Sequence, residues 1–452
     1  MACDNGAMFA ATARGLIAHA LPILVAQLSS IGMMLVDTVV LGHVSAVDLA
    51  AVAIGGGLHV SVIFALAGVL QAVAPVVAHL HGAKRDDEVA GVLQQGFWLA
   101  LLLSVPGVAF LRVPDLVLAL TSMDPAIESR VRDYLSLLAW GLPAALCYRT
   151  FYGFCNALGR PRVLMAIGFA SLGLHGVLAW GLALEGWLGE PLGVSGCALS
   201  NIGIAWLACG AGAAYLHFGP LGKRYRPLQG WRRPDGARWK ELLRLGLPMG
   251  LSNLVEITAF TLVALFIAPL GAEIVAGHRI VANLATLCYM LPLSLSLATL
   301  AAVGQAMGAR DFPAARRSVG AGLALAMGLA TGAGAVLWLA AEPVVGFYSD
   351  QAGVRQVALS LIPLIVAYQL CDAWQTVAGH ALRACRVAFL PMVIQVLCFW
   401  GIALGGGWWL AYRAADPLGV AGFWIAAIFG LALAAVLLAV LLRQIFKSAA
   451  AR

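Results

Sequence analysis

Long stretches without a charged side chain constrain this chain more than any other feature of its sequence. A membrane-spanning helix needs roughly 20 predominantly apolar residues, and nine charge-free stretches are longer than 20 residues. In lipid, only helices and closed barrels satisfy every backbone polar group, and barrel strands of about ten residues are far shorter than these stretches. The stretches are 15–36, 49–83, 89–111, 163–184, 191–222, 280–309, 318–341, 387–412 and 417–442.

Three further apolar stretches each contain a single charge in their interior. Together with the nine they predict an all-α integral membrane protein with twelve transmembrane helices. The charged residues are Arg149 in 134–159, Glu256 in 245–272 and Asp372 in 356–382. The twelve spans are expected at 15–42, 50–80, 90–112, 131–156, 163–185, 192–218, 241–270, 274–306, 315–341, 356–382, 387–411 and 417–443.

The composition excludes two large classes of protein. Hydrophobic residues make up 62% of the chain and charged residues 11%, whereas an ordinary globular domain has about 45–50% apolar and about 25% charged residues. This apolar composition excludes a soluble enzyme. A nucleic-acid-binding protein is also excluded, because the basic residues that give the net charge of +7 lie in short connections between spans. No CxxC pair or phosphate-binding GxxxxGK[ST] loop is present, so neither a metal site nor direct ATP drive is indicated.

The distribution of Lys and Arg predicts the orientation of the chain. The connections on the side of the N-terminus hold 21 basic residues, and those on the other side hold five. Because basic connections face the cytoplasm, we expect both termini to be cytoplasmic. The first apolar stretch is too long for a signal peptide and lacks a small-residue cleavage site, so it is expected to remain as the first span.

The two halves of the sequence match at a nearly constant offset of about 226 residues. Many matches in the same order indicate an internal duplication. The basic segment 223–240 is the natural linker between an N-lobe at 1–222 and a C-lobe at 241–452. It is interpreted as a topology-setting loop, with contact to anionic lipid as the alternative. The matches include Leu21-Pro22 with Leu247-Pro248, Gly82-Ala83 with Gly308-Ala309, and PLGV at 191–194 with PLGV at 417–420.

Each half has six expected spans, so the chain returns to its starting side between the halves. The lobes should therefore have the same topology and be related by a pseudo-two-fold axis along the membrane normal. This arrangement is typical of secondary transporters, in which substrate binds near the midplane and is exposed alternately to each side.

Three acidic residues lie inside expected spans: Asp37, Glu256 and Asp372. A charge at the centre of a membrane helix costs about 2.5–3.5 kcal/mol on insertion scales, so these acids are functional candidates by default. The alternative is a neutral, hydrogen-bonded structural carboxyl. A carboxylate that binds either a cationic substrate or a coupling ion would couple export to an inward ion gradient. Tyr368 lies one turn before Asp372 on the same helix face and is expected to join that site.

Other polar residues within spans leave two interpretations each. Arg149 and Arg279 either snorkel to a span end or pair with an intramembrane acid. His59 and His175 are either packing residues or proton relays. A drug-accepting cavity rich in thioether and aromatic groups is predicted from residues for which core packing is the alternative: Met33, Met34, His175, Asn201, Phe260, Tyr289, Met290 and Trp374.

Over nearly its whole length the chain resembles the multidrug and toxic compound extrusion (MATE) family. The resemblance rests on four stretches: LPILVAQLSSIGMMLVDTVVLGHVSAVDLAAVAIG at 21–55, LPMGLSNLVEITAF at 247–260, AVGQAMGARD at 302–311 and YQLCDAWQTVAGHALRA at 368–384. The combination of Glu256 with Asp372 resembles the NorM-type subfamily. Its implied function is antiport, with cationic amphipathic drugs moving out as protons or sodium ions move in.

The resemblance also implies roles for single residues. Glu256, Asp372 and Tyr368 would form a cation site at which Na⁺ is a candidate, and Asp37 would take part in ion coupling. Where the family often has two asparagines near the helix-one Asp, this chain has His175 and Ala179. That departure weakens a sodium site at Asp37 and favours protonation there.

Two functions remain open on the sequence. The first is an ion-coupled exporter of cationic drugs, and the alternative is a flippase or exporter of a lipid-linked oligosaccharide or other metabolite from the same superfamily. The three intramembrane acids favour cationic substrates. We expect a monomer in the bacterial inner membrane that contacts lipids and small cations, without enzymatic activity and without a cofactor apart from the coupling ion H⁺ or Na⁺.

Overall fold

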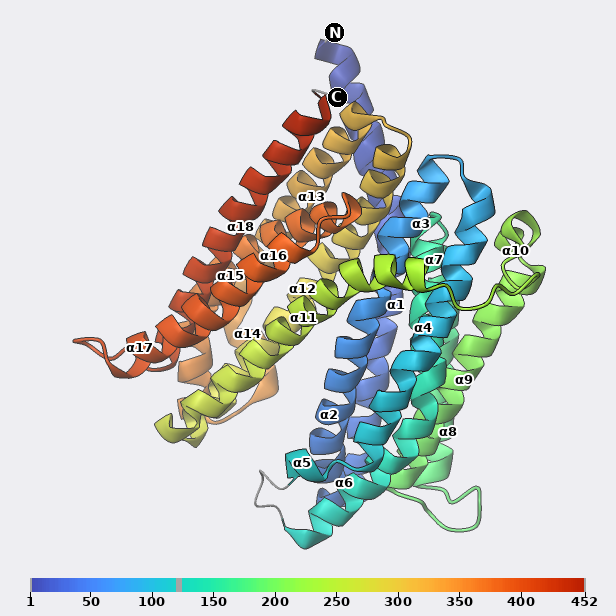
Figure 1. Cartoon of the computed structure of the whole chain (residues 1–452). Helices are drawn as coiled ribbons and strands as arrows, with labels where there is room; N and C mark the ends of the chain where they lie inside the picture. Colours follow the sequence, from blue (N-terminus) through green and yellow to red (C-terminus); the bar gives the residue numbers. More distant parts are fainter. Residues whose placement is uncertain (1, 119–123, 451–452) are drawn as a thin grey trace. The chain divides into compact units, whose positions relative to one another are not determined.

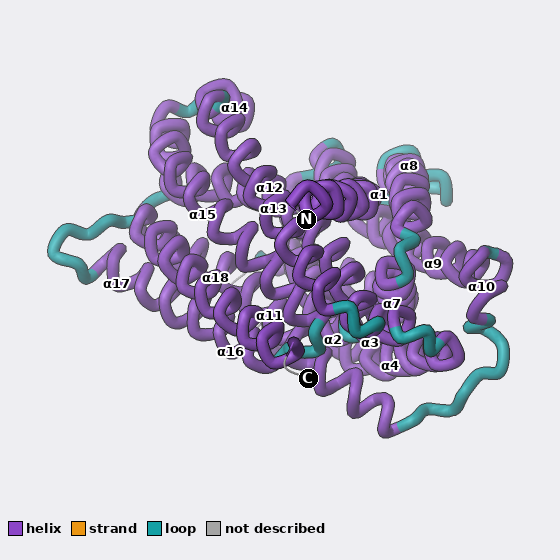
Figure 2. The backbone as a smooth tube through the Cα atoms, turned by 90° about the horizontal axis from the view of Figure 1, so that it is seen from above, coloured by secondary structure: helices purple, strands orange, loops and turns teal. Residues whose placement is uncertain are grey.

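The computed structural model describes residues 2–118 and 124–450, and it is helical almost throughout (Figures 1 and 2). Across those two ranges no β-strand occurs, and 11 helices are long and apolar enough to cross a membrane. The predicted all-α membrane fold class is thereby confirmed.

The chain forms two compact units. We call Pro22–Gly250 the N-terminal unit, and Leu251–Arg452 together with Met1–Leu21 the C-terminal unit. Their boundaries fall inside two long helices, α1 (Ala2–Gly42) and α11 (Gly236–Ile267). The basic segment 223–240, which the sequence suggested as a linker, lies within the N-terminal unit.

Besides its parts of α1 and α11, the N-terminal unit contains nine α-helices among the described residues. Prolines and glycines mark several of their ends, as expected of residues that begin or terminate helices. The helices are α2 (Ala46–Leu70), α3 (Val73–Gly82), α4 (Asp86–Arg112), α5 (Asp115–Leu118), α6 (Pro125–Leu138), α7 (Leu142–Ala157), α8 (Pro161–Ala183), α9 (Val194–Phe218) and α10 (Pro220–Tyr225).

The fourth predicted span, 131–156, is a broken helix. It consists of α6 and α7, joined by the 3₁₀ turn η1 (Ala139–Gly141). Proline is tolerated in the first turn of a helix because its missing N–H would have no partner there, and Pro143 occupies that position in α7. The twelve predicted spans thus correspond to this broken helix and to eleven other helical spans, one of which, Val47–Gly82, is itself interrupted between α2 and α3.

The C-terminal unit continues from α11 through a second series of helices. One of its spans, Phe389–Tyr412, is formed by α16, a π-helical segment and α17. The elements are η2 (Ala268–Leu270), α12 (Ala272–Gly308), α13 (Phe312–Leu339), α14 (Ala341–Tyr348), α15 (Ala352–Ala384), α16 (Phe389–Val396), the π-helical η3 (Leu397–Gly406), α17 (Gly407–Tyr412) and α18 (Val420–Ala450).

The backbone reproduces the repeat that the sequence suggested. Gly193 and Gly419 occupy the same place in the two PLGV motifs, and both have a positive φ, of 53° and 55°. This is the left-handed region that glycine enters without steric cost. Lys84 and Arg310, also 226 positions apart, have φ of 56° and 59°. The same loop geometry therefore follows corresponding helices in both halves.

The basic segment is held against α4 by two glutamine side chains. Gln94 donates to the carbonyl oxygen of Pro227 at 2.9 Å, and Gln95 donates to that of Arg233 at 2.9 Å. Their side-chain oxygens accept from the backbone N–H groups of Arg232 and Asp235. The segment is thus a docked part of the N-terminal unit rather than a free tether.

The connection before this segment is also anchored. Arg224 donates to Asp86 at 2.8 Å, and the hydroxyl of Tyr225 lies 2.9 Å from Nδ1 of His81. Burial raises the pKa of Tyr225 to about 12, so its hydroxyl keeps its proton at neutral pH and is available as the donor.

Small side chains fill the helix contacts, and large ones face outward. One buried cluster of the C-terminal unit includes Ala298, Ala321 and Ala373, and small residues let membrane helices approach closely. By contrast, Leu339 and Phe347 are 85% and 90% exposed. Outward apolar side chains are expected of a surface that contacts lipid tails.

Candidate functional site

Asp37 is buried within the N-terminal unit and is held by two other helices. Its Oδ1 lies 3.0 Å from Nε2 of His175 on α8, and its Oδ2 accepts a hydrogen bond of 2.9 Å from Nδ2 of Asn201 on α9. The side chain of Asp37 is 8% exposed, and that of His175 is fully buried. Both carboxylate oxygens are therefore occupied by nitrogen groups in an apolar surrounding.

Ser200 completes this cluster on the far side of the imidazole. Its Oγ lies 2.9 Å from Nδ1 of His175 and 3.3 Å from the backbone oxygen of the same residue. If the hydroxyl donates to Nδ1, the imidazole is neutral and its Nε2–H donates to Asp37. If the hydroxyl donates to the carbonyl, it can accept from a protonated Nδ1. One rotation of the hydroxyl thus accommodates the gain of one proton.

A cavity of about 190 Å³ lies in the N-terminal unit next to this cluster. Met33 and Asn201, two of the residues predicted for a substrate cavity, line it. Asn201 also donates to Asp37 and to the backbone oxygen of Cys197, so one side chain contacts both the cavity and the buried carboxylate. His175 does not line the cavity, and Met34 is 56% exposed and does not line it either.

The second acidic cluster lies in the C-terminal unit. Asp372 on α15 is buried, with 2% of its surface exposed, and it interacts electrostatically with Glu256 on α11. Tyr289 on α12 and Arg383 at the end of α15 interact with Glu256. The structure thus brings together three of the predicted residues, Glu256, Asp372 and Tyr289, and adds a buried cation.

Amide side chains extend this cluster toward α16. Gln375 donates to Oδ1 of Asp372 at 3.5 Å, and Gln395 donates to the side-chain oxygen of Gln375 at 3.3 Å. All three side chains are buried. Buried polar groups need such partners because an unpaired one costs free energy.

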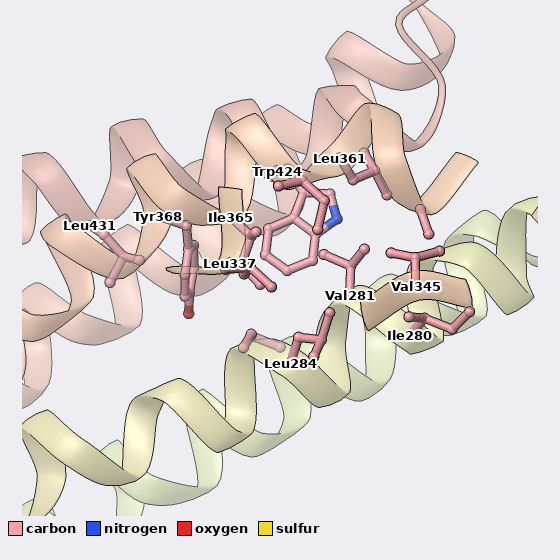
Figure 3. Close-up of a cluster of buried hydrophobic side chains, with 14 of the residues drawn as sticks. Ile280, Val281, Leu284, Leu337, Val345, Leu361, Ile365, Tyr368, Trp424 and Leu431 are labelled. Atoms are coloured by element: carbon pink, nitrogen blue, oxygen red, sulfur yellow. The ribbon is translucent and has the colours of Figure 1, made fainter. Parts of the chain in front are cut away.

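Tyr368 lies with Trp424 in a buried cluster of hydrophobic side chains (Figure 3), and it interacts electrostatically with Asp372 and Glu256. Its ring contacts those of Phe260 and Trp424 at centroid distances of 6.1 and 5.4 Å. With His278, these residues line an apolar pocket of about 40 Å³. Phe260 therefore lines this small pocket, and its predicted place in a drug-accepting cavity stays a prediction. Two other predicted cavity residues, Met290 and Trp374, are half-buried on α12 and α15 and do not line this pocket.

The structure also identifies residues that sequence reasoning missed. Arg383 is one of the 21 basic residues that the sequence assigns to the connections on the side of the N-terminus, but it is part of α15 and only 6% exposed. Its position 11 residues after Asp372, three helical turns along one face, was the available signal. Ser200 and Gln375 gave no such signal, because isolated polar residues within spans are ordinary interhelical contacts.

The two predicted intramembrane arginines do not pair with acids. Neither Arg149 nor Arg279 forms an ion pair with any residue that the structure describes. Arg149 lines the cavity of the N-terminal unit, whereas Arg279 is exposed.

Comparison with known proteins supports the internal repeat. The MatE family model matches this chain at residues 22–180 and again at 248–409. The two matches start 226 residues apart, which is the offset found within the sequence.

The chain is similar to bacterial multidrug resistance proteins along nearly its whole length. It is 50% identical over 433 residues to a probable multidrug resistance protein NorM of Aromatoleum aromaticum, covering 95% of this chain and 93% of that protein. It is 34% identical to multidrug resistance protein NorM of Aliivibrio fischeri, covering 94% and 92%, and 32% identical to multidrug resistance protein MdtK of Edwardsiella ictaluri, covering 95% of each.

Solved structures show the same fold at lower sequence identity. The chain matches a eukaryotic MATE transporter with a TM-score of 0.87 at 18% identity, over 98% of both chains. It matches an outward-facing multidrug resistance MATE family transporter with a TM-score of 0.87 at 19% identity, over 97% of this chain and 96% of that one.

Proposed function

Because this chain belongs to the multidrug and toxic compound extrusion family of membrane transporters, we propose that it is an ion-coupled antiporter that exports cationic amphipathic drugs by alternating access. The observation that carries the proposal is a pair of buried acidic clusters, one in each unit. Ionisable groups within membrane helices are costly and mark ion and substrate pathways.

The chemistry of the N-terminal cluster supports a proton as its coupling ion. A sodium ion needs several oxygen ligands, as hard cations do, whereas both oxygens of Asp37 face nitrogen groups of His175 and Asn201. The amide N–H of Asn201 would repel a metal cation. A proton needs no such shell, and the Asp37–His175 pair can hold it on either partner.

The C-terminal cluster supports the uptake of a single monovalent cation. With Glu256, Asp372 and Arg383 all ionised, its formal charge is −1, and one added cation makes it neutral. Neutrality is strongly favoured in a low-dielectric interior. Either H⁺ or Na⁺ would supply this one positive charge, and carboxylate and hydroxyl oxygens can bind both ions. Na⁺ at Glu256, Asp372 and Tyr368 is therefore part of the proposal.

The cavity of the N-terminal unit supports the link between ion and substrate. Met33 and Asn201 line it, and Asn201 hydrogen-bonds Asp37. When Asp37 loses its proton, its negative charge offsets the positive charge of Arg149, which also lines the cavity, so that a cationic substrate can bind there. When the proton returns, the positive charge of Arg149 is no longer offset and the substrate is released.

The cellular setting completes the proposal. We place the protein in the bacterial inner membrane as a monomer with both termini cytoplasmic, in contact with lipids and small cationic substrates. No cofactor is invoked apart from the coupling ion.

Transport by purified protein in proteoliposomes tests this function. Uptake or release of the lipophilic cation tetraphenylphosphonium would be measured under a proton gradient and, separately, under a sodium gradient. We expect Asp37→Asn, Glu256→Gln and Asp372→Asn each to lower gradient-driven transport at least about tenfold. Asp350→Asn serves as the control, because Asp350 is an exposed acid in a connection.

Two outcomes would contradict the proposal. If all three variants transport like the wild type, ion coupling does not depend on these acids. If neither gradient drives the cation, the substrate class is wrong, and the alternative of a lipid-linked oligosaccharide would be tested next.

A further inference from the structure

The basic segment before α11 carries two arginines that are not paired with acids. Residues 223–244 hold eight basic and two acidic side chains. Arg224 pairs with Asp86, whereas Arg232 and Arg233 are exposed and form no ion pair with any residue that the structure describes. Two adjacent guanidinium groups therefore face the surroundings with their charge uncompensated.

The backbone that carries both arginines runs beside α4 (Figure 1) and is fixed to it. The side-chain oxygen of Gln94 accepts from the backbone N–H of Arg232 at 3.1 Å, and Gln95 donates to the carbonyl oxygen of Arg233 at 2.9 Å. The guanidinium of Arg232 also donates to the backbone oxygen of Asp87 at 3.4 Å. A group on a fixed backbone loses less conformational freedom when a ligand binds, so the pair is preorganised at the side of α4.

Two tryptophans lie beside these arginines. The rings of Trp98 and Trp231 contact each other at a centroid distance of 5.9 Å, and Nε1 of Trp98 donates to the carbonyl oxygen of Arg232 at 3.1 Å. The two tryptophans are 36% and 51% exposed. Tryptophan is enriched where lipid headgroups meet the apolar core of a membrane. The indole pair therefore indicates the level of the headgroups, and Arg232 lies at that level.

An apolar stripe continues from Trp98 along α4. Leu101, Leu102 and Val105 are 44%, 50% and 66% exposed. They follow Trp98 by three, four and seven residues, a spacing that puts all four side chains on one face of the helix. The stripe runs toward the interior of the expected span 90–112. Cations at the headgroup level and an exposed apolar stripe below them match the two ends of a phospholipid.

We propose that Arg232 and Arg233 bind the phosphate of an anionic phospholipid whose acyl chain lies along the apolar stripe of α4. A guanidinium binds phosphate oxygens through paired N–H···O bonds, and clusters of basic residues at a membrane surface attract anionic lipids. A soluble phosphate would use the arginines alone, so the stripe favours a lipid as the occupant. Binding of this lipid does not depend on the proposed antiport.

Native mass spectrometry of the purified protein tests the site. The protein would be released from detergent that contains phosphatidylglycerol and phosphatidylcholine with the same acyl chains at equal mole fractions. The two lipids differ in the net charge of the headgroup. The readout is the ratio of the dissociation constants for the first bound lipid, phosphatidylcholine over phosphatidylglycerol.

We expect the wild type to favour phosphatidylglycerol, and the double variant Arg232→Gln with Arg233→Gln to lower the ratio about tenfold, because it removes two charges at the headgroup level. Lysine at both positions should lower it less, since an ammonium keeps the charge without the planar donors. The control is Arg310→Gln with Arg316→Gln, which removes two exposed arginines of the other unit and should leave the ratio unchanged.

Three results would overturn the proposal. One is a wild-type protein that binds both lipids equally well, and another is an equal effect of the two glutamine double variants. The third is displacement of phosphatidylglycerol by sn-glycerol 3-phosphate at similar concentration, because that molecule carries the phosphate without acyl chains and would assign the arginines to a soluble ligand.

Discussion

At Asp37, the partners of one carboxylate define its chemistry. His175 and Asn201 come from two other helices and bind its two oxygens, and Ser200 holds the opposite nitrogen of the imidazole. Each of these side chains alone is an ordinary polar residue of a membrane helix. Their combination makes the site at which we propose proton uptake.

Ser200→Ala tests this arrangement. The variant removes the hydroxyl that accepts from, or donates to, Nδ1 of His175. A neutral hydrogen bond contributes about 1 kcal/mol, and about 1.4 kcal/mol corresponds to one pH unit. We expect the pH at which proton-driven transport is half-maximal to move by up to about one unit, while the protein still folds.

The control for this variant is Ser61→Ala. Ser61 donates only to a backbone carbonyl of its own helix, that of Gly57. A pH profile of Ser200→Ala that coincides with those of Ser61→Ala and the wild type would exclude a role of the hydroxyl in proton uptake.

In the C-terminal unit, Arg383 should stabilise the protein through Glu256. Removing one partner of a buried charge pair typically costs about 3–5 kcal/mol. We expect Arg383→Gln to lower the thermal unfolding temperature in detergent clearly, and Glu256→Gln to lower it little. The double variant should be more stable than Arg383→Gln alone, because it removes the uncompensated carboxylate.

Thermal unfolding of the four proteins forms a double-mutant cycle. Additive effects of the two substitutions would show that Arg383 and Glu256 do not interact, and would remove the charge count on which the single-cation proposal depends.

At the level of elements, the repeated PLGV motif controls how two helices begin. Gly196 follows the first motif at the start of α9, and Gly422 follows the second at the start of α18. A Cβ atom at Gly196 would lie 2.7 Å from the backbone of Leu182 and Ala183, and one at Gly422 would lie 2.9 Å from that of Ala411. In both halves, glycine lets a helix start against the end of the helix before it.

Gly196→Ala is therefore expected to destabilise the protein. Overpacking typically costs about 1–3 kcal/mol, and here the neighbouring atoms belong to backbone that cannot rotate away. The control is Gly210→Ala on the same helix, where a Cβ would meet nothing within 4 Å. Equal unfolding temperatures of the two variants would contradict this account.

Local hydropathy explains which features of the helices the sequence predicted. Span positions follow from local hydropathy, and eleven of the twelve appear as helical spans that are long and apolar enough to cross a membrane. The interruption at η1 and the π-helical segment η3 were not predicted. Both depend on packing and on backbone hydrogen bonding within an apolar stretch, and residue hydropathy does not report either one.

For the whole molecule, the imbalance of basic residues predicts the orientation in the membrane. The 21 basic residues on one side of the expected spans, against five on the other, should keep both termini in the cytoplasm. We expect a green fluorescent protein fused after Arg452 to be fluorescent and an alkaline phosphatase fused there to be inactive. The reverse pattern would refute the orientation and the direction of export derived from it.

Taken alone, the sequence determined the membrane class, the positions of the spans, the internal duplication and the three acids that lie within spans. These are properties of single residues and of local stretches, and the low charge content makes each exception visible. The roles of those acids remain predictions.

Only the tertiary structure decided which side chains meet. Asp37 finds partners 138 and 164 residues away, Arg383 interacts with Glu256, and Arg149 lines a cavity. Such contacts depend on the rotation and packing of each helix about its axis. Hydropathy determines that a helix lies in the membrane. Which face of that helix packs against a neighbouring helix depends on the side chains of both.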